Sequence, residues 1–347
     1  MSYEIDADIT RASTLPGRFY SDPVAFGVMR ERVFARSWQF LGDLAEVAKP
    51  CSLSPRDLLP GLLDEPLLLA RDEKGQVRCL SNVCTHRGNI LVKSPCVAKD
   101  IRCGYHSRRF NLAGRMTFMP EFGAAKDFPS AGDHLPSVAF GEWAGLGFAS
   151  LSPAANFDDF FDDVQVATAG LPLARMQPDA TRSHDYEVNA HWALYVENYL
   201  EGFHIPYVHA ALNTVVDYGS YETRVHRYSN VQVALAKDGT PAAQYWWVFP
   251  NLMLNFYPWG LSLNLVQPLG IDRTRVQFRS FVWDPSRLES GAGAGLDRVE
   301  AEDEAIVEAV QRGVRSRLYK HGRYSPTRER GVHHFHRLLC EFLGEDA

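Results

Sequence analysis

Two short segments of the chain each combine a cysteine with a histidine. Cys84 and His86 occur in Cys-Thr-His-Arg-Gly, and Cys103 and His106 occur in Cys-Gly-Tyr-His. Two thiolates and two imidazoles suit a tetrahedral zinc ion. They also suit a [2Fe–2S] cluster in which the cysteines bind one iron and the histidines bind the other. Separate buried thiols and core histidines are the alternative that involves no metal.

The joint occurrence of both motifs favours the iron–sulfur cluster over zinc. This ligand set is that of a Rieske [2Fe–2S] centre, in which Cys84 and Cys103 hold the ferric iron and the two histidines hold the other. Neutral imidazoles raise the reduction potential above that of an all-thiolate cluster. The other cysteines lack a matching pattern and are expected to be inert thiols: Cys51, Cys79, Cys96 and Cys340.

A second pair of histidines lies in the middle of the chain. His204 and His209 flank Pro206, so the segment cannot be one undisturbed helix. A helix that ends near His204 and is followed by a turn would aim both rings at one point. Glu201 would then lie one helical turn before His204, on the same face. Two histidines alone are usually structural, but with a carboxylate they form a facial triad that binds non-haem Fe(II).

The carboxylate is predicted from an apolar stripe that follows the glycine-rich residues 291–295. The stripe consists of Leu296, Val299, Ile306, Val307, Val310 and Val314. Asp303 falls inside this stripe, where an apolar residue is expected. A buried carboxylate needs a partner, which would be a metal ion or an arginine. We predict the metal, with Glu302 and Glu308 on neighbouring faces as lesser candidates.

The composition excludes several classes of protein. The net charge of −6 gives no basic surplus, so a nucleic-acid-binding protein is not expected. The most apolar stretch, residues 251–270, is interrupted by polar residues, proline and glycine, so no membrane span is expected. The N-terminus lacks the basic start and apolar core of a signal peptide. We therefore expect a soluble, cytoplasmic protein.

The pattern of apolar residues predicts an α+β chain in three parts. Residues 1–40 indicate an entry segment with one helix that begins after Asp22. Residues 41–152 contain short apolar stretches separated by turn residues, which is typical of an all-β domain. Residues 153–347 combine a helix near Trp192–Tyr199 and a long helix after the glycines with several strands. The predicted strands are Ser183–Val188, Val231–Ala236, Tyr245–Phe249, Leu261–Pro268 and Arg275–Val282.

Taken together, the sequence resembles the Rieske non-haem iron oxygenases, specifically the catalytic α subunits of the ring-hydroxylating dioxygenase family. The resemblance runs through nearly the whole chain. It includes Phe34–Trp38, the two Cys/His loops, Glu197–His209, Pro250–Asn255 and Glu308–Gly313. It implies an N-terminal all-β Rieske domain and a C-terminal helix-grip (START-like) catalytic domain with an antiparallel sheet and helices, with residues 1–40 packed on the catalytic domain.

The resemblance also implies roles for individual residues. His204, His209 and Asp303 would bind the mononuclear Fe(II), and Asn198 would be a further residue of the catalytic site. Glu201 matches the family's bridging acid, usually aspartate, which links the iron-site histidine to a cluster histidine of the neighbouring subunit. The implied assembly is therefore a homotrimer in which electrons pass from His106 of one subunit through Glu201 of the next.

The implied reaction is insertion of oxygen from O₂ into a small organic substrate. Electrons would come from an NAD(P)H-dependent reductase or a ferredoxin. Glutamate at position 201 resembles the branch that acts on quaternary ammonium compounds such as carnitine, choline and glycine betaine. Dihydroxylation or demethylation of an aromatic substrate is the alternative within the family. Outside it, a Rieske electron carrier and a zinc-stabilised binding protein of the lipid-carrier type are alternatives.

Two departures from related patterns are visible. Respiratory Rieske proteins have a further cysteine in each loop, but this chain has Asn89 and Tyr105 there, so the loops cannot be joined by a disulfide. The oxygenase family commonly has Gly-Trp after the second cluster histidine, but this chain has Ser107-Arg108.

Aromatic residues of the second domain are expected to line the substrate pocket. An aromatic box binds a quaternary ammonium group through cation–π attraction, and packing in the strand core is the alternative for each residue. The candidates are the segment Tyr245–Phe249 with Phe256, Tyr257 and Trp259. The histidines of His333-His334-Phe335-His336 are expected to lie on a helix surface or a subunit contact, without a metal.

Overall fold

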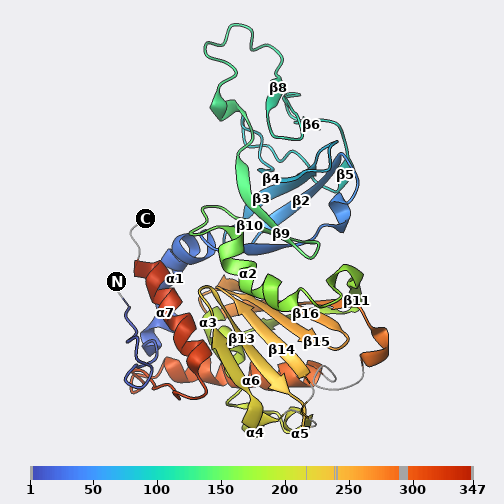
Figure 1. Cartoon of the computed structure of the whole chain (residues 1–347). Helices are drawn as coiled ribbons and strands as arrows, with labels where there is room; N and C mark the ends of the chain where they lie inside the picture. The colour runs from blue at the N-terminus through green and yellow to red at the C-terminus, as the bar shows by residue number, and fades with distance from the viewer. Residues whose placement is uncertain (1–2, 216, 238, 240, 289–295, 345–347) are drawn as a thin grey trace. The chain divides into compact units, whose positions relative to one another are not determined.

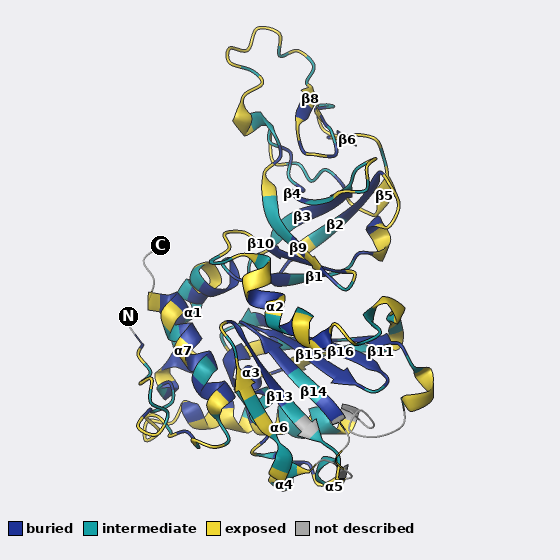
Figure 2. Cartoon of the chain, in the orientation of Figure 1, coloured by how far each residue is buried: buried dark blue, intermediate teal, exposed yellow. Residues whose placement is uncertain are grey.

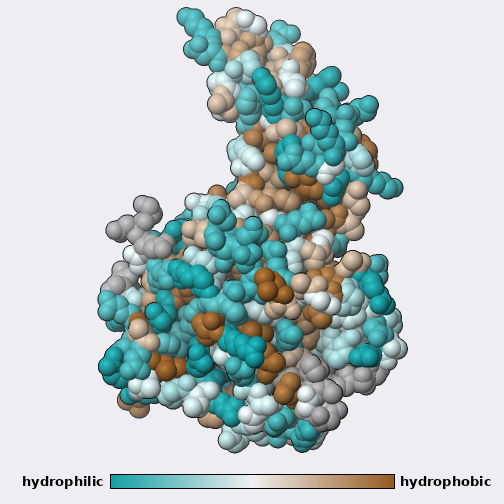
Figure 3. All heavy atoms as spheres, viewed as in Figure 1, coloured by the Kyte–Doolittle hydropathy of each residue, from teal (hydrophilic) through white to brown (hydrophobic). Residues whose placement is uncertain are grey.

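The computed structural model describes residues 3–215, 217–237, 239, 241–288 and 296–344. Its contacts divide the chain into two compact units, Trp38–Ala154 and the two segments on either side of it, so the N-terminal residues belong to the second unit (Figure 1). None of the described helices is long and apolar enough to cross a bilayer. On the face drawn in Figure 3, hydrophobic residues form small scattered groups over the second unit.

The unit Trp38–Ala154 is built of strands. A seven-stranded sheet has the order β1-β10-β9-β4-β3-β2-β5, and a three-stranded sheet has the order β6-β7-β8. The strands are β1 Gln39–Asp43, β2 Ser52–Leu58, β3 Glu65–Arg71, β4 Val77–Ser81, β5 Cys96–Val97, β6 Ile101–Arg102, β7 Arg109–Phe110, β8 Met116–Phe118, β9 Ser137–Trp143 and β10 Leu146–Ser150. The 3₁₀ turns are η3 Ala45–Val47 and η4 Ala131–Asp133. All described strand pairs of the unit are antiparallel.

Strand β3 is buried on both faces, which explains its continuous apolar sequence. Successive side chains of a strand point to opposite faces. Leu67 and Leu69 pack in one apolar cluster, while Leu68 and Ala70 pack in a second cluster. The second cluster also contains Cys84 and Cys103. The core of the unit therefore reaches directly to the loops that carry the four predicted cluster ligands.

The two Cys/His loops share one backbone hydrogen-bonding pattern. The N–H of Gly88 donates to the carbonyl of Cys84 (2.9 Å), and the N–H of Ser107 donates to the carbonyl of Cys103 (3.1 Å). In return, each cysteine N–H donates to the carbonyl five residues later, at Asn89 (2.9 Å) and at Arg108 (2.8 Å). Both loops thus close around their cysteine in the same way.

This turn requires a left-handed backbone at the fourth residue after each cysteine. Gly88 adopts it with φ 69°, which costs glycine little because it has no Cβ. Ser107 adopts it with φ 60°, although a residue with a Cβ is strained there by about 1 kcal/mol. The replacement of the family's usual glycine by Ser107 therefore leaves the loop shape intact at an energetic cost.

The second unit is organised around a seven-stranded antiparallel sheet of order β11-β17-β16-β15-β14-β13-β12 (Figure 1). Its strands are β11 Gln177–Val188, β12 Glu222–Val225, β13 Ser229–Leu235, β14 Pro241–Val248, β15 Leu252–Tyr257, β16 Gly260–Gly270 and β17 Arg273–Val282. Its helices are α1 Pro23–Met29, α2 Phe157–Thr168, α3 Trp192–Tyr199, α4 Ile205–Val208, α5 Leu212–Val215, α6 Leu296–Val314 and α7 Arg330–Gly344. Its shorter helical turns are η1 Gly17–Ser21, η2 Arg30–Phe34, η5 Leu173–Arg175, η6 Tyr218–Ser220 and η7 Pro285–Arg287.

Burial in this unit is greatest in the middle of the sheet and in the helix that packs on it. All residues of β15 are buried, and Figure 2 shows the central strands mostly in dark blue. Helix α3 packs against both β16 and α6, and its residues Trp192–Val196 are buried. The expected α+β fold class is confirmed. Helices α3 and α6 lie next to the predicted site of His204, His209 and Asp303.

Two local predictions were wrong. Helix α3 ends at Tyr199 rather than near His204, and His204 instead precedes the short helix α4, which has Pro206 in its first turn. Proline is tolerated there because the first N–H groups of a helix have no intrahelical partner. The histidine tract lies in α7, but His333 and His336 are buried rather than on a surface. Tyr324 and His336 share a hydrogen bond of 2.6 Å between the tyrosine OH and Nδ1.

Replacing Ser107 by glycine should stabilise the second Cys/His loop. Ser107→Gly removes the Cβ from a left-handed position and should raise the free energy of unfolding by about 1 kcal/mol. Loss of the visible cluster absorbance on heating the holoprotein would measure this, as a higher midpoint temperature. Ser107→Ala is the control, because both variants lose the exposed bond from Arg102 Nη2 to the Ser107 hydroxyl (3.0 Å). Equal midpoints for the two variants would refute the strain.

Candidate metal centres and substrate cavity

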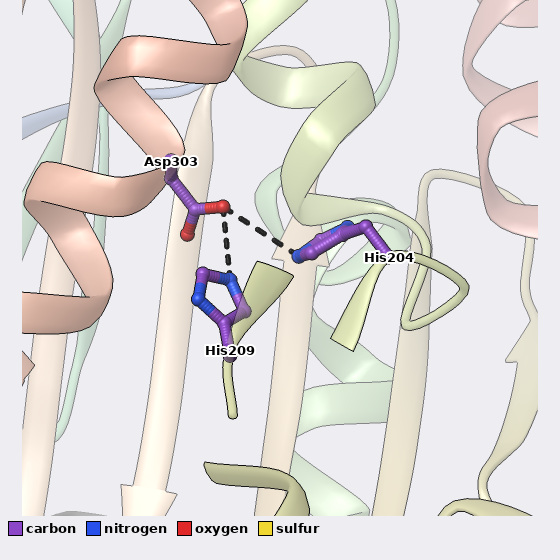
Figure 4. A group of neighbouring side chains, drawn as sticks. All are labelled: His204, His209 and Asp303. Atoms are coloured by element: carbon purple, nitrogen blue, oxygen red, sulfur yellow. Dashed lines mark hydrogen bonds and ion pairs between the residues drawn. The ribbon is translucent and has the colours of Figure 1, made fainter. Parts of the chain in front are cut away.

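Three side chains from two elements converge in the second unit. His204 and His209 lie at the two ends of α4, and Asp303 lies in α6. Asp303 Oδ1 is 3.1 Å from His209 Nε2 and 3.5 Å from His204 Nε2 (Figure 4). One ligand atom from each residue lies within 4.8 Å of the others. The structure therefore brings together the three residues that the sequence analysis predicted as iron ligands.

A carboxylate holds each histidine on the side away from Asp303. Glu201 Oε1 is 2.7 Å from His204 Nδ1, and its other oxygen accepts the backbone N–H of His204 (3.0 Å). Glu302 Oε2 is 2.8 Å from His209 Nδ1. Glu302 is itself bonded by Arg298 Nε (3.0 Å). A carboxylate on Nδ1 fixes the tautomer and orientation of a histidine that binds metal through Nε2.

The electrostatics of His209 follow from the same contacts. Burial alone lowers the pKa of His209, but its hydrogen bonds to Asp303 and Glu302 outweigh this and raise the pKa overall. The same bond to His209 lowers the pKa of Glu302. The carboxylates around the two histidines therefore favour a cation bound at the two Nε2 atoms.

Several side chains around this group differ from the sequence-based predictions. Glu201 is in a loop rather than on a helical face, and it reaches His204 because the chain turns before α4. Glu302 supports His209 instead of replacing Asp303. Glu308 accepts hydrogen bonds from the backbone and side chain of Asn189 (2.9 and 2.8 Å). Neither lesser candidate therefore takes the ligand position.

The apolar stripe that pointed to Asp303 is only partly buried. Val307 is 1% exposed, whereas Ile306 and Val310 are 40% and 42% exposed. Val299 lines the cavity described below. The side of α6 that carries Asp303 therefore faces a cavity rather than a continuous apolar core.

The histidine–aspartate group opens into a cavity of about 90 Å³. A single water needs about 10–15 Å³ measured in this way, so the cavity accommodates a small organic molecule. Asn198 and Glu201 line it, together with Asn255 and Asn264. Five tyrosines supply the other main part of its wall: Tyr195, Tyr199, Tyr221, Tyr245 and Tyr257.

Most of the aromatic residues predicted for the pocket lie elsewhere. Of that set, Tyr245 and Tyr257 are among the residues that line the cavity. Trp247 packs against Phe335 of α7 with ring centroids 5.4 Å apart, and Phe256 lines a separate depression with Pro258. Side chains alternate between the two faces of a strand, so a run of aromatic residues cannot all face one cavity.

The sequence analysis did not predict one carboxyl group of the cavity. Glu300 of α6 lines the cavity, and the Tyr195 hydroxyl donates to its Oε2 (2.7 Å). Burial raises the pKa of Glu300 to about 8. Its spacing of three residues before Asp303, which places both on one helical face, was the signal available in the sequence.

The Cys/His loops of the first unit bring together the four side chains that the sequence analysis predicted as cluster ligands. Cys84 and Cys103 are buried, and the amide of Asn89 lies 3.6 Å from Cys103 Sγ. The rings of His86 and His106 are edge to face with centroids 4.8 Å apart. His106 Nδ1 is buried and has no hydrogen-bond partner among the described residues, which is costly for a nitrogen that binds no metal. The two thiols and two imidazoles therefore fit a Rieske [2Fe–2S] cluster.

The cysteines also differ in their electrostatic surroundings. Burial raises the pKa of the Cys84 thiol. For Cys103, burial is opposed by hydrogen bonds from the backbone N–H groups of Tyr105 and His106, and the pKa is lowered. Backbone donors of this kind stabilise the thiolate, which is the form that binds iron.

Arg108 occupies the place of the family's usual tryptophan, and it is buried. Its Nη2 donates to Asp133 Oδ1 at 2.5 Å. Its guanidinium carbon lies 5.5 Å from the ring centroid of Phe128 and 5.8 Å from that of Phe110. Arg108 is therefore a buried cation within the Rieske unit, paired with one carboxylate and packed on two rings.

Comparison with protein families gives two matches. Residues 43–129 match the Rieske [2Fe-2S] domain, and residues 220–345 match the catalytic domain of the ring hydroxylating alpha subunit. The first match includes all four predicted cluster ligands. The second includes Asp303 but begins after His209.

Curated relatives match along almost the whole chain. Choline monooxygenase from chloroplasts of Arabidopsis thaliana is 29% identical over 358 residues, which cover 95% of this chain and 83% of the relative. The carnitine monooxygenase oxygenase subunit of Escherichia coli K12 is 29% identical over 367 residues, which cover 96% of this chain and 95% of the relative.

Solved structures show the same fold. The quaternary ammonium Rieske monooxygenase CntA in complex with L-carnitine has a TM-score of 0.77 at 24% identity, over 97% of both chains. Naphthalene 1,2-dioxygenase with indole bound has a TM-score of 0.72 at 16% identity, over 95% of this chain and 92% of that chain. The chain therefore joins a region that matches the Rieske [2Fe–2S] domain to one that matches the catalytic domain of the ring hydroxylating α subunit, and it is homologous to choline monooxygenase and to the oxygenase subunit of carnitine monooxygenase.

Proposed function

We propose that this Rieske oxygenase hydroxylates a quaternary ammonium compound at an Fe(II) ion held by His204, His209 and Asp303. The observation that carries the proposal is the approach of both histidine Nε2 atoms to one carboxylate oxygen of Asp303. Two histidines and one carboxylate on one face leave open positions for O₂ and substrate at a non-haem iron. The cavity beside them supplies the space for that substrate.

The residues present fit both iron groups. Cys84, His86, Cys103 and His106 would hold the cluster, and the triad would hold the mononuclear ion. When bound, the two groups supply electron storage and the reductive activation of O₂. Glu201 and Glu302 keep each histidine's Nε2 directed at the ion by bonding Nδ1. The tyrosines and Asn198 of the cavity wall orient the substrate and exclude bulk water.

A Rieske oxygenase needs a reductase, and we propose that a ferredoxin or an NAD(P)H-dependent reductase supplies this chain. We further propose a cytoplasmic homotrimer in which His106 of one subunit delivers electrons through Glu201 of the next to His204. The carboxylate of Glu201 supports this role, because one oxygen bonds His204 Nδ1 and the other bonds the His204 backbone. Conversion of an aromatic substrate is the alternative that the following experiment distinguishes.

A substrate panel with a surrogate reductase tests the proposed function. Choline, glycine betaine, carnitine and monocyclic aromatics should be scored for hydroxylated or C–N-cleaved product, because O₂ uptake also occurs in uncoupled turnover. Product from an ammonium compound supports the proposal. Product from an aromatic compound alone refutes it.

Removing one triad histidine should separate the two iron groups. His204→Ala should lower the iron content from about three to about two atoms per chain, because the mononuclear site loses a ligand while the cluster keeps all four. The visible cluster spectrum should persist and product formation should disappear. His321→Ala is the control, since His321 is exposed. Unchanged iron content in His204→Ala would show that the triad does not bind the ion.

Glu201→Gln should affect electron delivery more than iron binding. Glutamine keeps an acceptor near His204 Nδ1 but removes the charge, and loss of such a supporting carboxylate costs about 10- to 100-fold in activity. The rate of cluster reoxidation in a single turnover should fall, with iron content retained. Glu222→Gln, at an exposed site bonded to Arg224, is the control. Normal reoxidation by Glu201→Gln would contradict the bridging role.

Arg108→Gln should lower the midpoint potential of the cluster. A buried positive charge favours the reduced state, which carries one more negative charge, so its removal should shift the potential down by on the order of tens of millivolts. A redox titration followed by electron paramagnetic resonance would measure the shift. Arg108→Lys, which keeps the charge, should restore most of the potential. An unchanged potential in Arg108→Gln would mean that Arg108 serves packing alone.

A further inference from the structure

We propose that the cavity selects a compact organic cation that carries no carboxylate group, with Glu300 as the counter-ion of its ammonium group. The inference rests on the proposed function and specifies the substrate class within it. It follows from three features of the cavity: its tyrosine walls, the position of Glu300, and the charges of the residues that line it.

The tyrosine rings of the cavity wall differ in orientation, so a bound cation can contact more than one aromatic ring. The rings of Tyr245 and Tyr257 are 6.0 Å apart and nearly perpendicular, at 79°. The Tyr199 hydroxyl oxygen lies 2.7 Å from Asn255 Oδ1 and 3.0 Å from the carbonyl oxygen of Trp246, and its single hydrogen serves these two acceptors, which fixes the ring in the wall. A cation within about 6 Å of an aromatic face is attracted by the ring quadrupole, most strongly where water is excluded.

Glu300 adds a carboxyl group to this tyrosine wall. It is held in place by the Tyr195 hydroxyl (2.7 Å), and Tyr195 is buried in α3. Burial raises the pKa of Glu300 to about 8. An opposite charge placed beside a buried carboxyl favours its ionised form. A cation beside Glu300 therefore stabilises the ionised form of this carboxyl group, whereas a neutral ligand does not.

The charges around the cavity oppose a substrate carboxylate. Among the described residues that line it, the acids are Glu201, Glu300 and Asp303, and none is a lysine or an arginine. A carboxylate in the cavity would lose its hydration without gaining a cationic side chain, which is unfavourable. Asparagines offer hydrogen bonds to a neutral hydroxyl instead: Asn198, Asn255 and Asn264. An amino alcohol such as choline fits this set better than a betaine or carnitine.

Ligand binding to the iron-loaded oxygenase, measured by calorimetry without reductase, tests the selection. Choline should bind at least about tenfold more tightly than glycine betaine or carnitine, because the latter two carry a carboxylate. It should also bind at least about tenfold more tightly than 3,3-dimethylbutan-1-ol, its neutral isostere, because the isostere lacks the charge. Equal or tighter binding of carnitine or glycine betaine would overturn the proposal.

Glu300→Gln identifies the residue responsible. The variant keeps an acceptor for Tyr195 but removes the charge, so choline binding should weaken at least about tenfold while binding of 3,3-dimethylbutan-1-ol stays within about twofold. Glu304→Gln, on the same helix but outside the cavity wall, is the matched control and should bind choline normally. Equal weakening for choline and its isostere would overturn the role of Glu300 as counter-ion.

The two proposals fail in different ways. If no ammonium compound yields product while an aromatic compound does, the proposed function itself is wrong. If ammonium compounds are converted but carnitine is preferred to choline, the function stands and the charge selection is wrong. If Glu300→Gln does not load iron, the wild-type protein still tests the charge selection. The comparison of choline with its isostere and with carnitine then shows whether the cavity prefers a cation without a carboxylate.

Discussion

The candidate active site depends on two carboxylate–imidazole hydrogen bonds that direct both histidines toward one acid. An imidazole can bind through either nitrogen. Glu201 on His204 Nδ1 and Glu302 on His209 Nδ1 leave both Nε2 atoms available for the proposed iron. The backbone cooperates, because the short helix α4 places one histidine at each of its ends. The acids that orient the rings come from different elements, the loop after α3 and helix α6, so the packing of α3 against α6 is part of the site.

Local sequence pattern was sufficient where the interactions are local. The two Cys/His loops close through hydrogen bonds between residues four or five apart, so the motif alone indicated the loop shape and the four candidate cluster ligands. The outcome of Ser107-Arg108 could not be predicted in the same way. Arg108 is accommodated by Asp133, which lies far along the chain in the 3₁₀ turn η4, and no spacing rule connects two such residues.

The second site was predictable only in part. Asp303 stood out as an acid in an apolar stripe, although Ile306 and Val310 of that stripe are exposed. The role of Glu302 depended on which side of α6 faces His209, and that is set by tertiary packing. The aromatic residues illustrate the same limit. Their type suggested a box, but the alternation of strand faces leaves Tyr245 and Tyr257 in the cavity wall and places Trp247 against α7.

Helix α6 carries three acids of the candidate site, and each acid has a different contact or position. Glu300 and Asp303 are three residues apart and line the cavity together, while Glu302 lies about 100° around the helix from Asp303 and reaches His209 Nδ1 instead. One helix therefore supplies the proposed iron ligand Asp303, the acid that supports His209, and the proposed counter-ion Glu300. Since these side chains share a rigid backbone, a rotation of α6 that improved one contact would disturb the other two. The packing of α6 on α3 must accordingly hold all three at once, and Tyr195 of α3 contributes directly by bonding Glu300.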